Sequence, residues 1–282
     1  MKKYWFSVCI LFLLTIIVVL NINWTRHTDV KKDVQVPVEE YEAGGQKGSS
    51  SPSTYEIDLP RTSKGVASQI LHRKGYVVSY NKDYLIPNWV AWHLTEEHLY
   101  GDTKRSSNAW HEDTDVPTPR ATSKDYKGSG WTRGHMCPAG DNKWNGEAMY
   151  ETFMFSNCCP QNGKLNSGTW NQIELACRRW AEKYGNVYIV CGPVFLKQKH
   201  EVIGENKVVV PEAFFKVVVC LKKGQEKGIG FICRNNDGNK QMDLYVNSIK
   251  QVERITGITF FPHLTREIAD KVKNDAKLNE WK

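Results

Sequence analysis

The 282-residue sequence has eight cysteines, but no two of them stand in the spacing Cys-x-x-Cys. That spacing is typical of zinc ribbons and of redox-active thiol pairs, so its absence argues against both classes of site. Cys9 lies in an apolar N-terminal run, so seven cysteines, an odd number, remain in the rest of the chain. At least one thiol is therefore expected to be free or paired between chains. Disulfides and buried free thiols remain open alternatives for the others, because the sequence does not give the pairing.

The sequence also lacks a second linker, because no segment rich in proline, glycine or serine interrupts it after about residue 60. Its composition, 40% hydrophobic and 24% charged residues, is sufficient for a packed globular domain. We therefore expect one large domain over residues 56–282. The excess of positive charge is small. A formal net charge of +7 suits a polyanionic partner, but it is also common in proteins without one.

The N-terminal residues 1–24 have the composition of a membrane signal. Residues 4–20 form an almost unbroken apolar run of about the length that spans a bilayer. Since no small-x-small cleavage site follows this run, an uncleaved signal anchor is favoured over a cleaved signal peptide. Lys2 and Lys3 favour placing the rest of the chain outside the cytoplasm, and basic residues beyond the run weaken this preference.

Residues 25–55 contain too few apolar side chains to fold and are expected to form a flexible linker. We thus expect a periplasmic or cell-surface protein that is anchored in the membrane, or a secreted protein if the N-terminal segment is cleaved. The sequence gives no protein partner and no oligomeric state.

Apolar residues recur in the remaining chain with both strand and helix periodicity. Residues 75–80 and 87–93 alternate in the manner of two strands joined by a hairpin turn. Further strands are expected over residues 187–191, 213–221 and 228–233, helices over 142–153, 169–184 and 246–256, and loops over 101–127 and 155–167. Because strands and helices do not alternate regularly, the predicted class is α+β, with a mixed or antiparallel central sheet and flanking helices.

Two of the expected helices carry end signals. Thr169 is placed to cap the helix over residues 169–184, with Gln172 completing a capping box, and Gly185 is placed to end it. The helix over residues 246–256 is amphipathic, which predicts that Ile249, Val252 and Ile255 face inward, and Gly257 is placed to end it.

Residues 131–140 read Trp-Thr-Arg-Gly-His-Met-Cys-Pro-Ala-Gly. Arg133 offers a planar fork of hydrogen-bond donors that fits phosphate. His135 has the side chain best suited to accept a proton near neutral pH. Gly134 between them allows the backbone to approach a ligand closely. Alone the pair is a weak signal, since an isolated histidine is usually structural and an isolated arginine is usually a surface charge.

A second stretch lies downstream, where residues 155–174 read Phe-Ser-Asn-Cys-Cys-Pro-Gln-Asn-Gly-Lys-Leu-Asn-Ser-Gly-Thr-Trp-Asn-Gln-Ile-Glu. On the expected helix, Glu174 and Arg178 are four residues apart and share one face. Asn166 precedes the N-terminal end of that helix, which favours phosphate, so the three side chains could converge. The simpler interpretation is a surface ion pair for Glu174 and Arg178, and a turn residue for Asn166.

Together the two stretches resemble the DNA/RNA non-specific endonucleases, the family of ββα-metal nucleases that includes endonuclease G. That family has an Asp-Arg-Gly-His motif, then an Asn-Pro-Gln-like run, then Leu-Asn-x-Gly-x-Trp followed by a glutamate. Their order and spacing are kept here, within a resemblance that extends over residues 76–264. One position departs, because Thr132 stands where the family usually has aspartate.

The resemblance implies a ββα-metal motif and metal-assisted hydrolysis of DNA and RNA without base preference, leaving 5′-phosphate ends. It implies that His135 is the general base that activates water, and that Asn166 binds Mg²⁺, or Mn²⁺ in its place. Mg²⁺ prefers oxygen ligands and often takes only one or two from the protein. Glu174 would hold water on the metal. Arg133 and Arg178 would steady the substrate and the developing charge.

The family also uses an upstream arginine to bind substrate, and Arg105 is the candidate for it here. Thr132 leaves an alternative open: a catalytically weakened, membrane-anchored nucleic-acid-binding protein on the same scaffold. A threonine hydroxyl can orient its neighbours by hydrogen bonding without a charge, so we expect activity to survive at a reduced level. The retained base and metal ligand argue against a decayed site.

Overall fold

In the computed structural model of the protein, the described residues are 58–106, 109–236 and 238–282. Contacts along the chain separate a first unit, Met1–Ser49, from a second, Ser50–Lys282. The expected signal anchor and linker lie outside the described residues, so both stay predictions. Within the described residues, no helix combines the length and the apolar character that crossing a membrane requires.

A seven-stranded sheet forms the centre of the second unit, and neighbouring strands in it are antiparallel. Its strands are, in spatial order, β1 (Gln69–His72), β2 (Val77–Asn81), β3 (Ile86–Thr95), β6 (Asn186–Val194), β9 (Ala213–Cys220), β10 (Lys227–Arg234) and β11 (Val246–Asn247). The five strands predicted from apolar periodicity are all present as β2, β3, β6, β9 and β10. The predicted α+β class with an antiparallel central sheet is confirmed.

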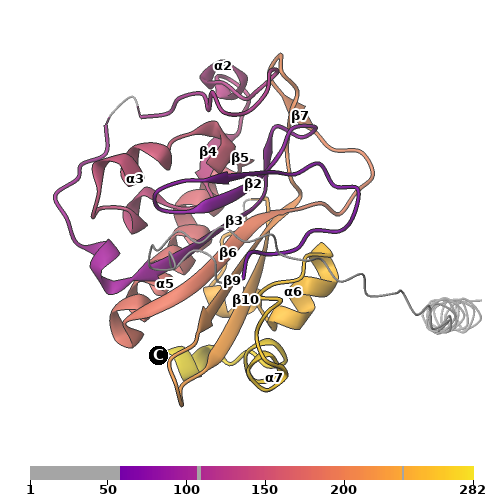
Figure 1. Ribbon diagram of the computed structural model, residues 1–282. Coiled ribbons are helices and arrows are strands. Elements are labelled where there is room, and N and C mark those ends of the chain that lie inside the picture. The colour runs from indigo at the N-terminus through magenta and orange to yellow at the C-terminus, as the bar shows by residue number, and fades with distance from the viewer. Residues whose placement is uncertain (1–57, 107–108, 237) are drawn as a thin grey trace, which may run out of the picture. The chain divides into compact units, whose positions relative to one another are not determined.

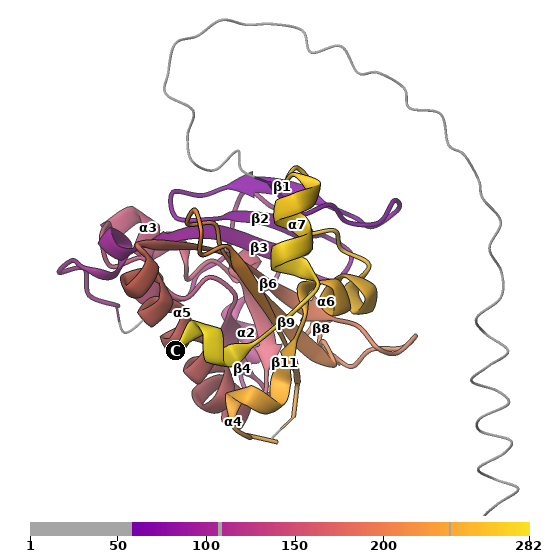
Figure 2. The ribbon, with the colours of Figure 1, turned by 90° about the horizontal axis from the view of Figure 1, so that it is seen from below.

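The sheet separates two hydrophobic cores. Helix α5 (Asn171–Tyr184) covers one face, and helices α6 (Ile249–Thr256) and α7 (Arg266–Lys273) cover the other, with α5 and α6 on opposite sides of the strands in Figure 2. Successive residues of a strand point to opposite faces, so Val78 packs in the core of α5 and Val77 in the core of α6 and α7. We call the side of α5 the site face and the side of α6 and α7 the far face.

Both predicted helix ends are confirmed. Gly185 follows α5 at a φ of 87°, and Gly257 follows α6 at a φ of 69°, in backbone conformations that glycine adopts without steric cost. The prediction that Ile255 faces inward is wrong, because it is 42% exposed. It borders a cavity between α6 and residues 62–67 instead of packing on the sheet.

A hairpin separate from the main sheet leads into α5. Strand β4 (Thr132–His135) pairs antiparallel with β5 (Cys158–Gln161), and α4 (Gly163–Leu165) follows at once. A π-helical turn, Asn166–Trp170, joins α4 to α5. These elements form the two strands and the helix of the expected ββα motif (Figure 1).

Two local predictions fail at this hairpin. The loop expected over residues 155–167 contains β5 and α4, because the Asn162 side chain caps α4 by accepting from the backbone of Lys164 and Leu165. The capping box predicted at Thr169 is also absent. Thr169 lies inside the π-helical turn, and its backbone N donates to Oδ1 of Asn239.

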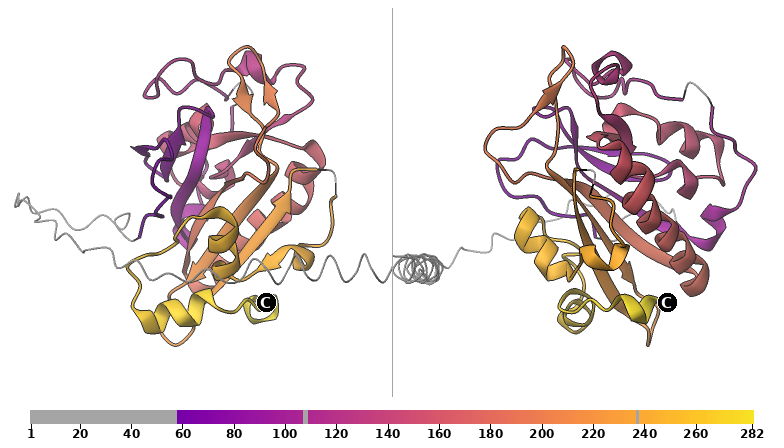
Figure 3. Two further views of the ribbon diagram at one scale, coloured as in Figure 1. Left: turned by 90° about the vertical axis from the view of Figure 1, so that its right-hand side faces the viewer. Right: turned by 180° about the vertical axis from the view of Figure 1, so that it is seen from behind.

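The other elements are short. They are η1 (Glu96–Leu99), α2 (Ser123–Tyr126), η2 (Ala139–Asp141), α3 (Gly146–Glu151), η3 (Phe155–Asn157), β7 (Val202–Ile203), β8 (Val208–Val209), η5 (Met242–Tyr245) and η6 (Leu278–Trp281). The helix expected over residues 142–153 corresponds to α3. The β7–β8 hairpin extends away from the sheet (Figure 3) and its turn contacts α2, where Asn206 Nδ2 donates to Asp125 Oδ2 at 3.0 Å.

Candidate active site

Strand β4 presents the arginine and the histidine of the first motif together. The alternation of a strand points Arg133 and His135 to one side and Gly134 to the other. A Cβ at Gly134 would lie 2.3 Å from Oε1 of Gln161 on the paired strand, so only glycine fits there. The glycine therefore allows the two strands to pack closely under the site.

The His135 ring is held by aromatic side chains. Its centroid lies 4.4 Å from that of Trp110 and 4.9 Å from that of Phe153. Within the described residues, its Nε2 atom is buried and has no hydrogen-bond partner. Burial, and secondarily the charge of Arg105, lower the pKa of His135 to about 3, so the imidazole is neutral at pH 7 and able to accept a proton.

Two arginines approach the same aromatic group. Cζ of Arg105 lies 5.0 Å from the ring centroid of Phe153, and Cζ of Arg133 lies 5.9 Å from that of Trp110. Neither guanidinium forms an ion pair within the described part of the chain. Both are exposed, so two cations remain available for an anion beside His135. The structure thus brings Arg105, selected on loose spacing, to the predicted site.

Asn166 is oriented by the residue that departs from the family motif. Its Nδ2 donates to Oγ1 of Thr132 at 3.1 Å and to the carbonyl oxygen of Arg133 at 3.5 Å. The Thr132 hydroxyl in turn donates to the carbonyl oxygen of Gln161 at 2.7 Å. The amide nitrogen makes these contacts, which leaves Oδ1 of Asn166 to face a ligand.

The π-helical turn sets the direction of Asn166. Gly168 within it has φ −101° and ψ −110°, and a Cβ there would lie 2.3 Å from Oδ1 of Asn239. The backbone is therefore kinked at Gly168, between the helical residues that precede it and α5. Asn166 therefore lies inside a helical segment, whereas the sequence placed it ahead of the helix.

The donor set at the site fits a hard cation better than a soft one. Among the described residues, no group of three or more His, Cys, Asp or Glu side chains could hold a metal ion. A neutral amide oxygen such as Oδ1 of Asn166, completed by water and phosphate, is an environment that Mg²⁺ accepts. The neighbouring thiols are unsuitable for a softer metal, since burial raises the pKa of Cys158 to about 12.

Glu174 and Arg178 lie on α5 near Asp141 and Lys216, and they do not form the ion pair that their spacing suggested. Arg178 Nη1 donates to Oδ1 of Asp141 at 2.7 Å, and Asp141 also accepts from Trp92 Nε1 at 3.1 Å. Asp141 is only 1% exposed, so it is the stronger partner for a guanidinium. Arg178 is therefore paired with a buried carboxylate and is not a free surface charge.

The environment of Glu174 favours its neutral form. Burial raises the pKa of Glu174 to about 7; Lys216 and Arg178 oppose the rise, and Asp141 adds to it. The carboxyl group therefore titrates close to neutral pH in the free protein. A cation bound beside it would favour the ionised form.

Sequence reasoning missed two charged residues, Asp141 and Lys216. Lys216 lies on β9, is 1% exposed, and places Nζ 4.5 Å from the ring centroid of Trp170 and 5.0 Å from that of Trp92. The signal was available, because Lys216 is the single charged residue of the strand Ala213–Cys220. Burying a lysine in a strand costs free energy unless neighbouring groups compensate its charge.

The thiol question is also answered for the described residues. All seven of their cysteines are free and buried, and all seven belong to the core of the site face. Of the two alternatives, disulfides or buried free thiols, the described cysteines are therefore buried free thiols. Burial raises the pKa of Cys159 and of Cys177 as well, so these thiols are unreactive.

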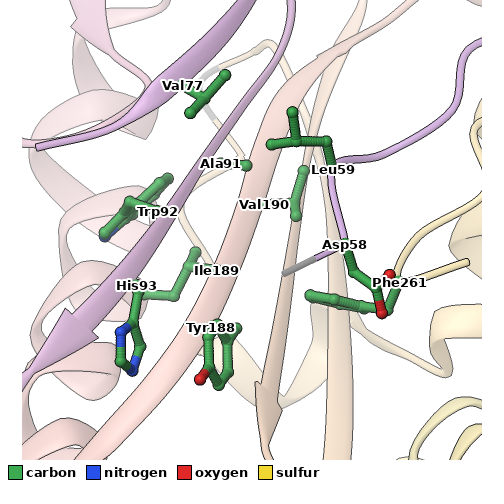
Figure 4. A pocket seen from close by; sticks show the side chains of 10 residues that line it. All are labelled: Asp58, Leu59, Val77, Ala91, Trp92, His93, Tyr188, Ile189, Val190 and Phe261. Atoms are coloured by element: carbon green, nitrogen blue, oxygen red, sulfur yellow. The ribbon is translucent and has the colours of Figure 1, made fainter. Parts of the chain in front are cut away.

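A second hollow lies beside Asp58, Leu59 and Phe261, where Figure 4 shows aliphatic and aromatic side chains around it. Its volume is about 20 Å³. That is room for a single water molecule rather than for a substrate. The stacked rings of His93 and Tyr188, with centroids 4.3 Å apart, border it.

Comparison with known proteins gives consistent results. The sequence profile of a family described as DNA/RNA non-specific endonuclease matches residues 57–267. The chain is 37% identical to mitochondrial endonuclease G of Bos taurus, over 78% of this chain and 77% of that protein. It is also 37% identical to nuclease C1 of Cunninghamella echinulata var. echinulata, over 76% and 90%.

A third relative is mitochondrial nuclease EXOG of Homo sapiens, 36% identical over 68% of this chain and 56% of that protein. The chain thus spans little more than half the length of that relative. Among solved structures, EndoG from its complex with EndoGI superimposes with a TM-score of 0.69 and 30% identity, covering 74% of this chain and 92% of that one.

Proposed function

Because the chain belongs to the DNA/RNA non-specific endonuclease family, we propose that it is a Mg²⁺-dependent endonuclease that hydrolyses phosphodiester bonds in DNA and RNA. The observation that carries this proposal is the buried, unpartnered Nε2 of His135, set between two arginines that form no ion pair in the described residues. A lone pair that accepts protons beside two free cations suits a reaction in which water attacks a phosphate.

His135 accepts the proton. The imidazole takes it from the attacking water, the water oxygen bonds to phosphorus, and the bond from phosphorus to the 3′ oxygen breaks. The products are a 5′-phosphate and a 3′-hydroxyl whose proton comes from solvent. The pKa of about 3 in the free protein is low for a base, and the negative charge of bound phosphate raises it towards a useful range.

The remaining residues hold the substrate and the water. Arg105 and Arg133 bind the phosphoryl oxygens, and the carboxylate of Glu174 orients the attacking water. Asn166 would hold Mg²⁺ through Oδ1, and Mn²⁺ could replace it. A cation held there would supply positive charge to offset the negative charge that develops on the phosphate. Because these contacts address phosphate and not bases, cleavage has little sequence preference.

The hydrogen bonds of Thr132 weigh against the alternative of a weakened nucleic-acid-binding protein. Thr132 was the feature that favoured that alternative, and its hydroxyl is bonded on both sides, to Asn166 and to Gln161. It therefore orients the proposed metal ligand without the charge of an aspartate. The extracytoplasmic, membrane-anchored location stays a prediction that rests on residues 4–20.

The test is cleavage of supercoiled plasmid and of RNA by the full chain, with Mg²⁺, with Mn²⁺ and with chelator. We expect degradation of both substrates that needs the metal and falls by at least about a hundredfold in His135→Ala. His93→Ala is the matched control, because Nε2 of His93 is also buried without a partner in the described residues, yet its ring stacks on Tyr188. Nucleic-acid binding by wild type without cleavage would refute the proposal and support the binding protein.

A further inference from the structure

A cavity of about 540 Å³ opens beside the site, between α3 and residues of the segments 103–106 and 109–111. Its volume falls in the range of about 300–1,000 Å³ that is usual for small-ligand pockets. Met149 and Phe153 provide a buried apolar wall, and Lys104 and Ser106 provide polar groups at the exposed side. The proposed roles of the active-site residues do not use this space.

An aromatic surface borders the cavity. The rings of His111 and Tyr150 stack with centroids 4.0 Å apart and an interplanar angle of 17°. His111 is fixed by a 2.7 Å hydrogen bond between its Nδ1 and the carbonyl oxygen of Ala109. Tyr150 is 57% exposed, and His111 covers only one face of its ring. Part of a large ring, supported from behind, is thus available to a planar ligand.

Phe153 connects this cavity to the reacting groups. It lines the cavity, meets the His135 ring edge to face at 4.9 Å, and lies under the guanidinium of Arg105 at 5.0 Å. A phosphate held by Arg105 next to His135 is therefore separated from the cavity by the width of one side chain. In a nucleic-acid strand the group at that distance from a phosphate is a neighbouring nucleobase.

We infer that the cavity receives the nucleobase of a nucleotide adjacent to the scissile phosphate, stacked on Tyr150. The inference rests on the proposed nuclease function and adds to it a binding site for the base. Every nucleobase has a π face, so stacking is compatible with cleavage at any sequence. The base must leave its own stack to enter, which single-stranded nucleic acid permits most easily.

The test uses a single-stranded, end-labelled oligonucleotide that carries one abasic residue, cleaved by the full chain with Mg²⁺. Base-to-ring stacking is worth about 1–3 kcal/mol, so we expect cleavage to fall roughly tenfold at one bond at a fixed offset from the abasic residue. In Tyr150→Ala this local minimum should disappear, because no stacking remains to be lost. Tyr150→Phe should keep it, and so should Tyr100→Ala, the matched control with 59% exposure.

Gly146→Leu provides a second variant that leaves the aromatic pair intact. Gly146 borders the cavity, and a Cβ there meets no atom within 4 Å, so a side chain can be added at this position without a clash at its first carbon. It should also remove the local minimum. Even cleavage of every bond by wild type, or a minimum that persists in both Tyr150→Ala and Gly146→Leu, would overturn the inference and leave the nuclease function standing. Failure of wild type to cut any oligonucleotide would instead overturn the proposed function.

Discussion

The two faces of the central sheet are built by the same strands and differ in what they bury. The far face packs aliphatic and aromatic side chains of the sheet against Ile249, Val252 and Val272 of α6 and α7. The site face buries Lys216 and Asp141 almost completely, whereas Lys273 of α7 on the far face is 9% exposed and is paired with Glu253 of α6. Polar burial of this kind costs free energy unless each group is paired.

Strand β9 shows the contrast within two consecutive residues. Val217 is fully buried in the hydrophobic core of the far face. Lys216 points to the opposite side and lies between the rings of Trp92 and Trp170. Because successive residues of a strand point to opposite faces, Val217 adds to the apolar core of the far face and Lys216 places a charge on the site face. We infer that the far face holds the fold together so that the site face can tolerate its charges.

The largest expected effect is on the far face. Phe260 is fully buried there and its ring centroid lies 5.3 Å from that of Phe215. Phe260→Ala should lower the free energy of unfolding by about 3–5 kcal/mol, because it removes a buried ring and leaves a cavity. Urea denaturation measures this loss. Nuclease activity at a temperature where the variant is folded should match wild type, and a parallel loss of activity would mean that the two faces are not independent.

Glu174→Gln on the site face should have the opposite effects, a loss of activity together with a gain in stability. We expect about a hundredfold loss of cleavage rate, since the amide cannot replace the carboxylate that we propose orients the attacking water. The same change should stabilise the protein at pH 8, because it removes a buried charge. Cleavage kinetics and thermal melting at several pH values measure the two effects.

The sign of the pH dependence follows from the pKa of Glu174, which burial raises from its ordinary value of 4.5 to about 7 in the folded protein. Between these values the folded protein binds a proton that the unfolded chain does not, so wild type loses stability as pH rises from 4.5 to 7. The gain in Glu174→Gln should reach on the order of 1–2 kcal/mol above pH 7 and vanish below pH 4.5, less than the full shift implies because the side chain is partly exposed. A gain that does not vary with pH would contradict this assignment.

Lys216→Met should separate charge from packing. The lysine opposes the rise in the pKa of Glu174, so its removal should raise that pKa further and shift the acid side of the pH–rate profile upward. We expect roughly five- to tenfold lower activity at pH 7, recovering near pH 9, with a free energy of unfolding that is unchanged or higher. Val217→Ala, the next residue on the opposite face, is the control. It should lower stability and leave the pH–rate profile in place.

The far face was the more predictable of the two from sequence. Its strands follow local apolar periodicity, and the end of α6 follows from Gly257, because a backbone with positive φ is a local property. Ile255 was misplaced because periodicity gives the side of a helix but not the extent of the sheet beneath it.

The site was predictable only as far as its motifs. His135, Arg133 and Asn166 were found through a resemblance and not through periodicity. Asp141 and Lys216 escaped because their partners come from distant segments: Arg178 lies 37 residues from Asp141 along the chain. Long-range pairing of this kind leaves no spacing signal, although a lone lysine in an apolar strand was a hint.

The smallest expected effect compares two capping boxes that look alike in sequence. Ser248 and Gln251 form a real one at the start of α6, with the Gln251 backbone N donating to Ser248 Oγ at 3.2 Å and the Ser248 backbone N donating to Gln251 Oε1 at 2.7 Å. Ser248→Ala should therefore cost about 1 kcal/mol of stability and leave cleavage unchanged.

Thr169 and Gln172 have the same spacing on the site face, yet Thr169 caps nothing. Its hydroxyl lies 2.7 Å from the carbonyl oxygen of Lys240 and holds the π-helical turn that carries Asn166. Thr169→Ala should cost a similar amount, about 1 kcal/mol for a lost hydrogen bond, and should also raise the Mg²⁺ concentration needed for half-maximal cleavage. If Ser248→Ala raised that concentration equally, the metal requirement would reflect general stability. A rise confined to Thr169→Ala would show that Thr169 acts on the metal requirement by holding the kinked segment that carries Asn166, and not by capping a helix.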